Sequence, residues 1–497
     1  MIYPFWDVQT GYGILMAIIA IVHVFISHFA IGGGLYLVVT EQMARRHNDE
    51  LTLAFLKKLT KFFVLVTLVA GVLTGVAIWF IIGLLNPLAT EALIHNYVWG
   101  WATEWTFFVG EITAALIYYY GWNKMSAKAH ITVGWIYFIF AWLSLVIING
   151  ILTFMLTPGK WLATGDFWDG FFNPTYWPSV VMRTGVCVML AGLYALLVAS
   201  RQTAGDFKAR IVRYSATWGL FGLAVTTVAQ GWYLKAILLT LTTKILPGPV
   251  LALRSAAWLA IAIGGLLLLA WLLARRLPVV VAVLLMAVGL TWFGAFESFR
   301  ESVRKPYVIT GYIYGNSVEV AKTEKYKKEG YLAQITYRSG DAGADLFRHA
   351  CRSCHTINGY RPLKPAFDGT DHKFIAGIIR GAQLLNANMP PFLGTPAEAD
   401  QVATYIYKCV DQRPLDQIYP ADDLGRQAFA IRCAKCHKLG TASDKSKSFT
   451  GQSVDDLNTM LDNLPELAEG MPAYTGNATE RAALVAYLQS LGKAVKK

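Results

Sequence analysis

The chain has 497 residues, of which 55% are hydrophobic and 15% charged, and its formal net charge is +12. Residues 1–300 hold only 30 of the 76 Asp, Glu, Lys and Arg side chains, so a membrane domain followed by a soluble domain is expected. This composition excludes a fibrous, disordered or purely cytosolic protein. Residues 1–300 carry 19 positive and 11 negative groups, and this excess lies between apolar segments, where it sets topology. Nucleic acid is therefore not an expected partner.

Eight apolar stretches are long enough to cross a bilayer, and we expect one transmembrane helix for each. They cover about 10–40, 59–86, 98–121, 131–156, 177–200, 214–241, 255–274 and 278–299. Lys and Arg gather in every second connection, beginning with the one between the first two spans. The positive-inside rule then places both termini, and everything after residue 300, on the periplasmic side of the inner membrane. The first span is too long for a cleavable signal and is expected to be an uncleaved anchor.

Four of the six cysteines form two C-x-x-C-H motifs, Cys351-Arg-Ser-Cys354-His355 and Cys433-Ala-Lys-Cys436-His437. This spacing is typical of covalent haem c, in which two thiols form thioethers and the adjacent His binds the iron. A zinc knuckle or a thioredoxin-type redox pair are the alternatives. Haem c is attached outside the cytoplasm, in agreement with the side of the membrane that the charge pattern indicates.

An internal repeat accompanies the two motifs. A shift of 82 superposes Asp341, Gly343, Phe347, Cys351, Cys354, His355, Met389, Pro390 and Tyr405 on Asp423, Gly425, Phe429, Cys433, Cys436, His437, Met471, Pro472 and Tyr487. Each unit resembles the class I cytochrome c fold, and the resemblance implies that Met389 and Met471 are the second axial ligands. The alternative for each is a loop Met that fills a gap in the core. We expect a membrane domain over 1–310, a linker over 311–340, and cytochrome c domains over 341–411 and 412–497.

Ionisable side chains within membrane spans are costly and indicate function by default. Five stand out: His23 and His28 in the first span, Glu104 and Glu111 in the third, and Glu301 at the outer end of the eighth. His23 and His28 are about 140° apart around a helix at ~100° per residue, so both cannot face one haem. Glu104 and Glu111 fall on one stripe, which suits a proton relay. A buried imidazole that bonds a neighbouring helix is the alternative for each His.

The first 310 residues resemble the haem-bearing large subunit of the cytochrome bd oxidase family. The resemblance depends on the order and spacing of His23-Val-Phe-Ile-Ser-His28, Gly32-Gly33-Gly34, 62–80, Glu104-Trp-Thr-Phe-Phe-Val-Gly-Glu111, Gly121-Trp122, Asn149-Gly150, Asn173-Pro174 and Glu301-Ser-Val-Arg304-Lys-Pro306-Tyr307. It implies an all-α bundle with one or two non-covalent haems of b or d type. It also implies that His23, Glu104 and Glu111 belong to the oxygen-reducing haem pair and that Glu301 is an axial ligand. A second multi-span subunit is expected on the same ground.

The departures from that family concern the electron donor. The family's low-spin b haem uses a His in the fifth span, where this chain reads Val181-Met182-Arg183-Thr184 without a His. It also uses a Met after the quinol loop, where Arg254-Ser255-Ala256-Ala257 has no Met. Only about a dozen residues, Thr242 to Leu253, join the sixth and seventh spans, where the family has a long quinol-binding loop. We therefore expect haem c, supplied by a periplasmic donor such as a cytochrome c, to replace quinol.

Three functions compete at this point. The first is a terminal oxidase that takes electrons through two c haems and reduces O2, with Glu104 and Glu111 as catalytic residues on a proton path. The second is an electron-transfer subunit of a larger respiratory complex, and the third is a membrane anchor with a degenerate haem site. Nitric oxide remains an alternative oxidant. Retention of His23, both glutamates and Glu301 favours the first function over the third.

Overall fold

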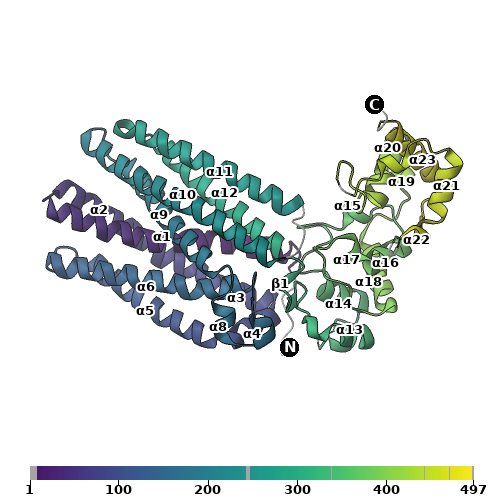
Figure 1. Ribbon diagram of the computed structural model, residues 1–497, viewed down its shortest axis with the longest axis horizontal. Helices are drawn as coiled ribbons and strands as arrows, with labels where there is room; N and C mark the ends of the chain where they lie inside the picture. Colours follow the sequence, from purple (N-terminus) through teal and green to yellow (C-terminus); the bar gives the residue numbers. More distant parts are fainter. Residues whose placement is uncertain (1–7, 242–246, 337, 442, 469–470, 495–497) are drawn as a thin grey trace. The chain divides into compact units, whose positions relative to one another are not determined.

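The computed structural model describes the chain except for residues 1–7, 242–246, 337, 442, 469–470 and 495–497. It contains two compact units, which are described separately (Figure 1). The membrane unit comprises Met16–Arg304 and Val308–Gly311. The C-terminal unit comprises Met1–Leu15, Lys305–Tyr307 and Tyr312–Lys497.

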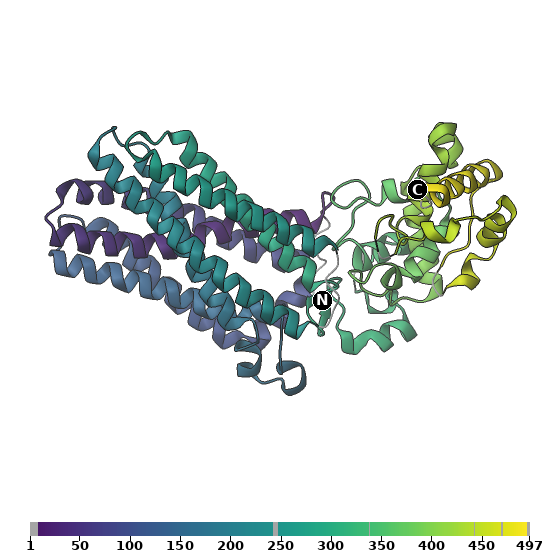
Figure 2. The ribbon, with the colours of Figure 1, turned by 45° about the horizontal axis from the view of Figure 1, so that its top comes forward.

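The membrane unit is a bundle of long helices that lie side by side (Figures 1 and 2). Its helices are α1 (Tyr12–Arg46), α2 (Glu50–Val64), the π-helix η1 (Leu65–Gly71), α3 (Val72–Leu85), α4 (Pro87–Asn96), α5 (Val98–Gly121), α6 (Ala127–Phe154), α7 (Trp161–Thr164), α8 (Phe167–Phe171), α9 (Tyr176–Ala199), α10 (Asp206–Thr240), α11 (Pro247–Leu272), the 3-10 turn η2 (Ala274–Arg276) and α12 (Val279–Arg304). The closest pairs are α5 with α6, α9 with α10, and α11 with α12.

Seven helices of the described chain are long and apolar enough to cross a membrane by length and composition, one fewer than the eight expected. The segment outside this set is α5, which forms a helix over almost the expected range, 98–121. Its two glutamates and its run of Trp and Tyr side chains lower its hydropathy below that of its neighbours. The second span begins earlier than expected, at Glu50, because α2, η1 and α3 continue one another. The chain is thus an integral membrane protein.

Local capping explains where several of these helices begin. The Asp49 carboxylate accepts from Thr52 N at the start of α2, and the Ser126 hydroxyl accepts from Ala129 N at the start of α6. At α4 the Asn86 side chain caps the helix and proline occupies the first helical position, where no amide is needed. These caps fix the residues at which α2, α4 and α6 begin.

Glycine permits the closest helix contacts of the bundle. A Cβ on Gly32 of α1 would lie 1.8 Å from the carbonyl oxygen of Cys187 in α9. A Cβ on Gly222 of α10 would lie 2.2 Å from the amide nitrogen of Met189. Backbones approach this closely in membrane helices only where a side chain is missing. Helix α9 is accordingly the most deeply buried of the seven spans.

The C-terminal unit is also helical, and the short strands β1 (Tyr307–Ile309) and β2 (Ile313–Tyr314) precede its helices in the chain. Its elements are the 3-10 turn η3 (Val320–Lys322), α13 (Thr323–Glu329), the 3-10 turn η4 (Leu332–Gln334), α14 (Ala342–Ala350), α15 (Lys364–Phe367), α16 (His372–Arg380), α17 (Ala382–Leu385), α18 (Pro396–Cys409), α19 (Leu415–Ile418), α20 (Ala421–Ala428), the π-turn η5 (Phe429–Cys433), the 3-10 turn η6 (Ser446–Phe449), α21 (Val454–Asp462), α22 (Leu464–Leu467) and α23 (Ala478–Ala494).

The sequence repeat has a structural counterpart, since α14 packs on α18 and α20 packs on α23. A Cβ on Gly343 would lie 2.6 Å from the Gln401 carbonyl oxygen, and one on Gly425 would lie 2.2 Å from that of Ala483. Beside each glycine an aromatic pair bridges the two helices. The ring centroids are 5.3 Å apart for Phe347–Tyr405 and 5.6 Å apart for Phe429–Tyr487. Both halves therefore close by the same crossing of a first and a last helix.

Residues 311–340, expected as a linker, pack onto the first repeat. Tyr314, Val318 and Tyr331 share one hydrophobic core with α14, α16 and α18. The carboxylate of Glu398, in the first turn of α18, accepts from the amides of Tyr331 and Leu332 at 3.0 and 2.8 Å. The first repeat thus has an additional N-terminal layer around its core.

Candidate functional site

The first C-x-x-C-H motif follows directly on α14. The amides of Cys354 and His355 both donate to the Cys351 carbonyl, at 3.0 and 2.9 Å, and so form one tight turn. His355 Nδ1 lies 3.3 Å from the Arg361 carbonyl oxygen. Because a carbonyl only accepts, Nδ1 carries the proton and Nε2 keeps its lone pair. The imidazole is thereby oriented as an iron ligand requires.

The second motif has the same backbone geometry. The amides of Cys436 and His437 donate to the Cys433 carbonyl at 3.1 and 2.9 Å. Among the described residues His437 Nδ1 is buried without a hydrogen-bond partner. In each repeat the turn follows directly on the first helical segment, as the sequence repeat predicts. The two motifs are therefore structurally equivalent.

The four motif cysteines are free thiols. Burial raises the pKa of Cys351 and of Cys433 to about 12. A thioredoxin-type pair requires the opposite, a lowered thiol pKa. In the described part of the chain, no three His, Cys, Asp or Glu side chains are placed to hold a metal ion, which removes support for a zinc knuckle. Two free thiols beside an oriented His fit covalent haem.

Met389 and Met471 lie in loops that precede the last helix of each repeat. The Met389 amide donates to the Asn386 carbonyl at 2.8 Å, and the Met471 amide donates to the Ala468 carbonyl at 3.1 Å. Both side chains are half-buried, and a proline follows each. The two methionines thus occupy equivalent positions, and ligation of iron by them remains a proposal.

The two repeats differ at another equivalent pair, Glu398 and Glu480. Glu480 is 1% exposed, and its carboxylate pairs with the Arg432 guanidinium and accepts from the Tyr474 hydroxyl at 3.0 Å. Arg432, 8% exposed, immediately precedes Cys433. A buried ion pair therefore anchors the second motif to α23, whereas Glu398 bonds backbone amides.

We expect Glu480→Gln to weaken the second repeat alone, because it leaves the Arg432 charge buried and unpaired. Loss of one partner of such a pair costs about 3–5 kcal/mol. Native-state hydrogen exchange of the full-length protein should show faster exchange in peptides of α20 and α23 and no change in those of α14 and α18. Glu466→Gln, an exposed position in the same repeat, is the control. Equal exchange in the two variants would contradict this role of the pair.

In the membrane unit His23 extends from α1 toward the junction of η1 and α3. Its Nδ1 lies 3.0 Å from Thr74 Oγ1, and the Thr74 hydroxyl has the carbonyls of Ala70 and Gly71 within 2.8 and 3.0 Å. The single hydroxyl proton goes to a carbonyl, so Thr74 accepts from His23 Nδ1–H. Nε2 of His23 then holds a lone pair and can bind iron. The π-helix η1 is adjacent, and π-helical turns within α-helices often occur at functional sites.

His28 has both ring nitrogens engaged. Its Nδ1 donates to the Val24 carbonyl at 2.7 Å, so Nε2 accepts, and Arg183 Nη1 lies 3.4 Å from it. The side chain is buried among α1, α9 and α12. Its bonding is that of a structural histidine, and His23 is the better candidate for a ligand.

Glu104 and Glu111 both face α6. Ser144 donates to Glu104 at 2.8 Å, and the Tyr137 hydroxyl lies 3.2 Å from the Glu111 carboxylate. The expected stripe on α5 is therefore matched by a polar stripe on α6.

Glu301 is the most exposed of the candidates, with 48% of its side chain accessible, and it pairs with Arg304. One turn earlier, Glu297 is 22% accessible and accepts from Arg300 Nη1 at 2.7 Å, while Arg183 Nη2 lies 3.7 Å away. This second pair was not singled out from the sequence, although Glu297 and Arg300 repeat the Glu-x-x-Arg spacing that begins at Glu301. Arg183, within the segment 181–184 that lacks the haem-binding His expected from the resemblance, is 3% exposed.

Comparison with known proteins bears on both parts of the chain. Residues 14–245 match the family described as cytochrome bd terminal oxidase subunit I. Residues 338–406 and 420–488 each match the family described as cytochrome c oxidase, cbb3-type, subunit III. The chain is a cytochrome bd-like membrane protein with two cytochrome c domains. It is thus a haem-binding oxidoreductase of respiratory type, and the resemblance and fold class expected from the sequence are confirmed.

A solved structure supports the fold of the cytochrome bd-like part. The bd oxidase from Geobacillus thermodenitrificans superposes with a TM-score of 0.51 at 16% identity, over 60% of this chain and 88% of that one. An identity this low shows the fold alone. No curated protein matches the chain.

Proposed function

We propose that this protein is a terminal oxidase subunit that takes electrons through two c haems from a periplasmic donor and reduces O2 at membrane haems. The observation that carries the proposal is the union, in one chain, of a cytochrome bd-like bundle and two C-x-x-C-H motifs. Helix α10 ends at Thr240 and α11 begins at Pro247, so no room remains for a long quinol loop. The connecting residues 242–246 lie outside the described part of the chain.

The residues present fit the haems that this function needs. Cys351, Cys354 and Cys433, Cys436 would form the thioethers, with His355 and Met389, and His437 and Met471, as axial ligands. His23 would bind one membrane haem through Nε2. Glu301, which pairs with Arg304, would be an axial ligand of the high-spin b haem. When bound, the haems supply the electron carriers and the iron at which a small oxidant is reduced.

Contacts between the two cytochrome c repeats support electron transfer between them. The Lys435 ammonium lies within the second motif, donates to the Ala366 carbonyl of the first repeat, and lies 4.3 Å from the ring centroid of Phe367. Pro472, next to Met471, packs on Gly377 of α16, where an added Cβ would lie 3.2 Å from it. Both ligand segments of the second repeat therefore adjoin the first.

Topology and assembly complete the proposal. Arg45 and Arg46 end α1, Arg275 and Arg276 form η2, and these basic ends mark the cytoplasmic side. With α5 crossing the bundle beside α6 as a further, less apolar helix (Figure 1), both termini and the cytochrome c repeats then lie in the periplasm. A second multi-span subunit, related to the small subunit of cytochrome bd oxidases, is proposed as a partner, and Glu104 and Glu111 are proposed to move protons.

Oxygen consumption by the purified protein, with reduced cytochrome c as donor, tests this function. We expect uptake of O2 that is lost in His23→Ala and retained in His28→Asn. Reduction of the c haems without any O2 uptake would instead support the alternative, an electron-transfer subunit of a larger respiratory complex. The same assay with nitric oxide distinguishes the other small oxidant.

A further inference from the structure

Two basic side chains at the second C-x-x-C-H motif reach the first repeat. Lys435, between the two motif cysteines, donates to the Ala366 carbonyl. Its ammonium lies 4.3 Å from the ring centroid of Phe367 and 5.3 Å from that of Phe374. The guanidinium of Arg432 lies 5.3 Å from the Phe374 centroid. At these distances the face of a ring attracts a cation, so two rings of the first repeat, which we call the aromatic pair, receive both charges.

The second repeat has no equivalent of this receiving surface. The shift of 82 places α16 on α21 residue for residue. Phe374 then corresponds to Asp456, which is exposed. Gly377, on which Pro472 packs, corresponds to Thr459. The first repeat is thus adapted to receive the second motif, and the contact has one direction only.

The first motif keeps its own cation within its own repeat. The shift of 82 places Ser353 at the position of Lys435. The basic residue of the first motif is instead Arg352, whose guanidinium lies 5.1 Å from the ring centroid of Phe347 in α14. The surroundings of the second motif therefore depend on the other repeat, whereas Arg352 contacts a ring of its own.

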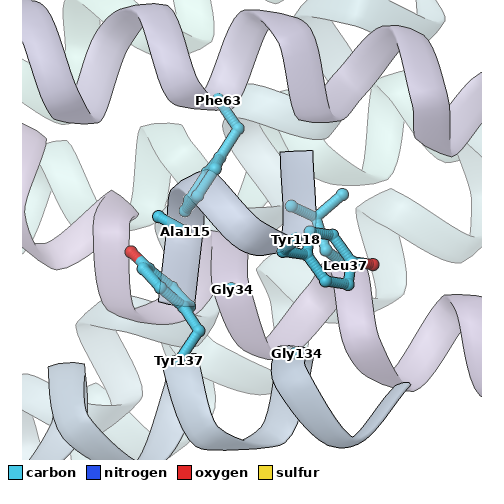
Figure 3. A pocket seen from close by; sticks show the side chains of 7 residues that line it. All are labelled: Gly34, Leu37, Phe63, Ala115, Tyr118, Gly134 and Tyr137. Carbon is cyan, nitrogen blue, oxygen red and sulfur yellow. The ribbon is translucent and has the colours of Figure 1, made fainter. Parts of the chain in front are cut away.

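Cations that are removed from water usually lie beside carboxylates, and the membrane unit follows this rule. Tyr118 lines a small cavity, and Figure 3 shows its hydroxyl oxygen on the side away from Tyr137. That hydroxyl donates to the buried carboxylate of Glu41 at 2.7 Å. The same carboxylate accepts from Arg45 Nε at 2.6 Å, and His130 Nδ1 lies 2.8 Å from it. The positive groups here are balanced by a negative one.

The half-buried Lys435 departs from that rule. Within the described part of the chain the titratable groups around it are Arg432, Cys433 and Cys436, and none of them is a carboxylate. The charge of Arg432 is already balanced by Glu480. The Lys435 ammonium is therefore an uncompensated charge, held by a carbonyl and the aromatic pair. It lies between the two thiols that would bind the second haem.

We propose that the first repeat holds the Lys435 ammonium beside the second haem and thereby draws electrons from the first c haem to the second. Oxidised haem iron carries one more positive charge than reduced iron, so a nearby cation favours the reduced state. One electron leaves the first iron and enters the second, and no proton moves and no bond changes. The inference rests on the proposed function, because it requires both c haems. A contact that only joins the repeats would leave the two potentials independent of the lysine charge.

Potentiometric titration of the covalent haems in the full-length protein tests this inference. Lys435→Met keeps the length of the side chain and removes its charge. We expect the equilibrium constant for electron transfer from the first c haem to the second to fall about tenfold, which is ~59 mV for one electron. The second haem is identified as the one whose potential also falls in Met471→Leu. The titrations are made at about pH 6, because burial lowers the pKa of Lys435 to about 7.

Three further variants separate the charge from the packing. Lys435→Arg keeps a cation over the aromatic pair and should keep the original constant. Lys438→Met removes the same charge from an exposed lysine next to His437 and should leave the constant unchanged, because water screens that charge. Phe367→Leu alters only the first repeat, and it should nevertheless lower the potential of the second haem.

An unchanged constant in Lys435→Met would overturn the proposal, as would an equal fall in Lys438→Met. A fall in Lys435→Met without any shift in Phe367→Leu would also overturn it, because the lysine would then act without the first repeat. Uptake of O2 is judged separately. If the potentials shift as expected in a protein that consumes no O2, the inference stands and the proposed function fails; uptake of O2 with an unshifted constant has the opposite meaning.

Discussion

Replacement of His23 by Ala is expected to remove one non-covalent haem per chain and to leave both covalent haems in place. The physical reason is the tautomer that Thr74 imposes, because Nδ1–H donates to the threonine hydroxyl and Nε2 alone remains for iron. The measurement is haem content per chain after acidic acetone extraction, which removes non-covalent haem and leaves thioether-linked haem on the protein. The extractable haem should fall by one equivalent.

Two matched variants sharpen this result. Thr74→Val keeps the shape of the side chain and removes the acceptor that orients His23, so haem affinity should fall about 10–100-fold. His28→Asn alters a histidine that bonds Val24 and Arg183, and it should leave the haem content unchanged. Full retention of extractable haem in His23→Ala would show that the ligand lies elsewhere in the bundle.

Substitution of Met389 or Met471 by Leu is expected to lower the reduction potential of one c haem in each case. A thioether ligand favours ferrous iron, and leucine fills nearly the same volume without a sulfur atom. The fall should exceed about 100 mV, a modest part of the ~0.8 V that axial ligands span. Potentiometric titration of the covalent haems in the full-length protein measures it.

Met460 provides the control for that experiment. It is partly buried in the core of the second repeat and lies on α21, away from both C-x-x-C-H turns in the sequence. Met460→Leu should leave both potentials unchanged. If Met389→Leu and Met471→Leu behave like Met460→Leu, the two loop methionines fill the core and bind no iron.

The cytochrome c half was predictable because its signals are local or periodic. The C-x-x-C-H turns close within five residues, and the shift of 82 paired Gly343 with Gly425 before any helix crossing was known. The crossing itself explains the pairing, since both glycines lie where a Cβ would meet the backbone of the last helix. The sequence did not reveal that Glu398 bonds backbone amides whereas Glu480 pairs with Arg432, because the residues around the two glutamates differ.

The membrane half was less predictable because its polar contacts join distant segments. His130 and Glu41 are 89 residues apart, and Arg183 and His28 are 155 residues apart. A stripe on one helix was detectable, as for Glu104 and Glu111, but the partners on α6 and α1 depend on which helices adjoin. The span count failed at α5 for a related reason. Helix α5 is long enough to span a membrane, but it contains polar residues that face polar residues of α6. These polar residues lower its hydropathy below that of the other spans.

In the proposed function, electrons from two covalent haems reach iron porphyrin held within the membrane bundle. The most direct test is the haem content and optical spectrum of the isolated full-length polypeptide. We predict two thioether-linked haems and at least one extractable haem of b or d type, whose spectrum changes when O2 is added to the reduced protein. A polypeptide that contains the two covalent haems and no extractable porphyrin would contradict the account.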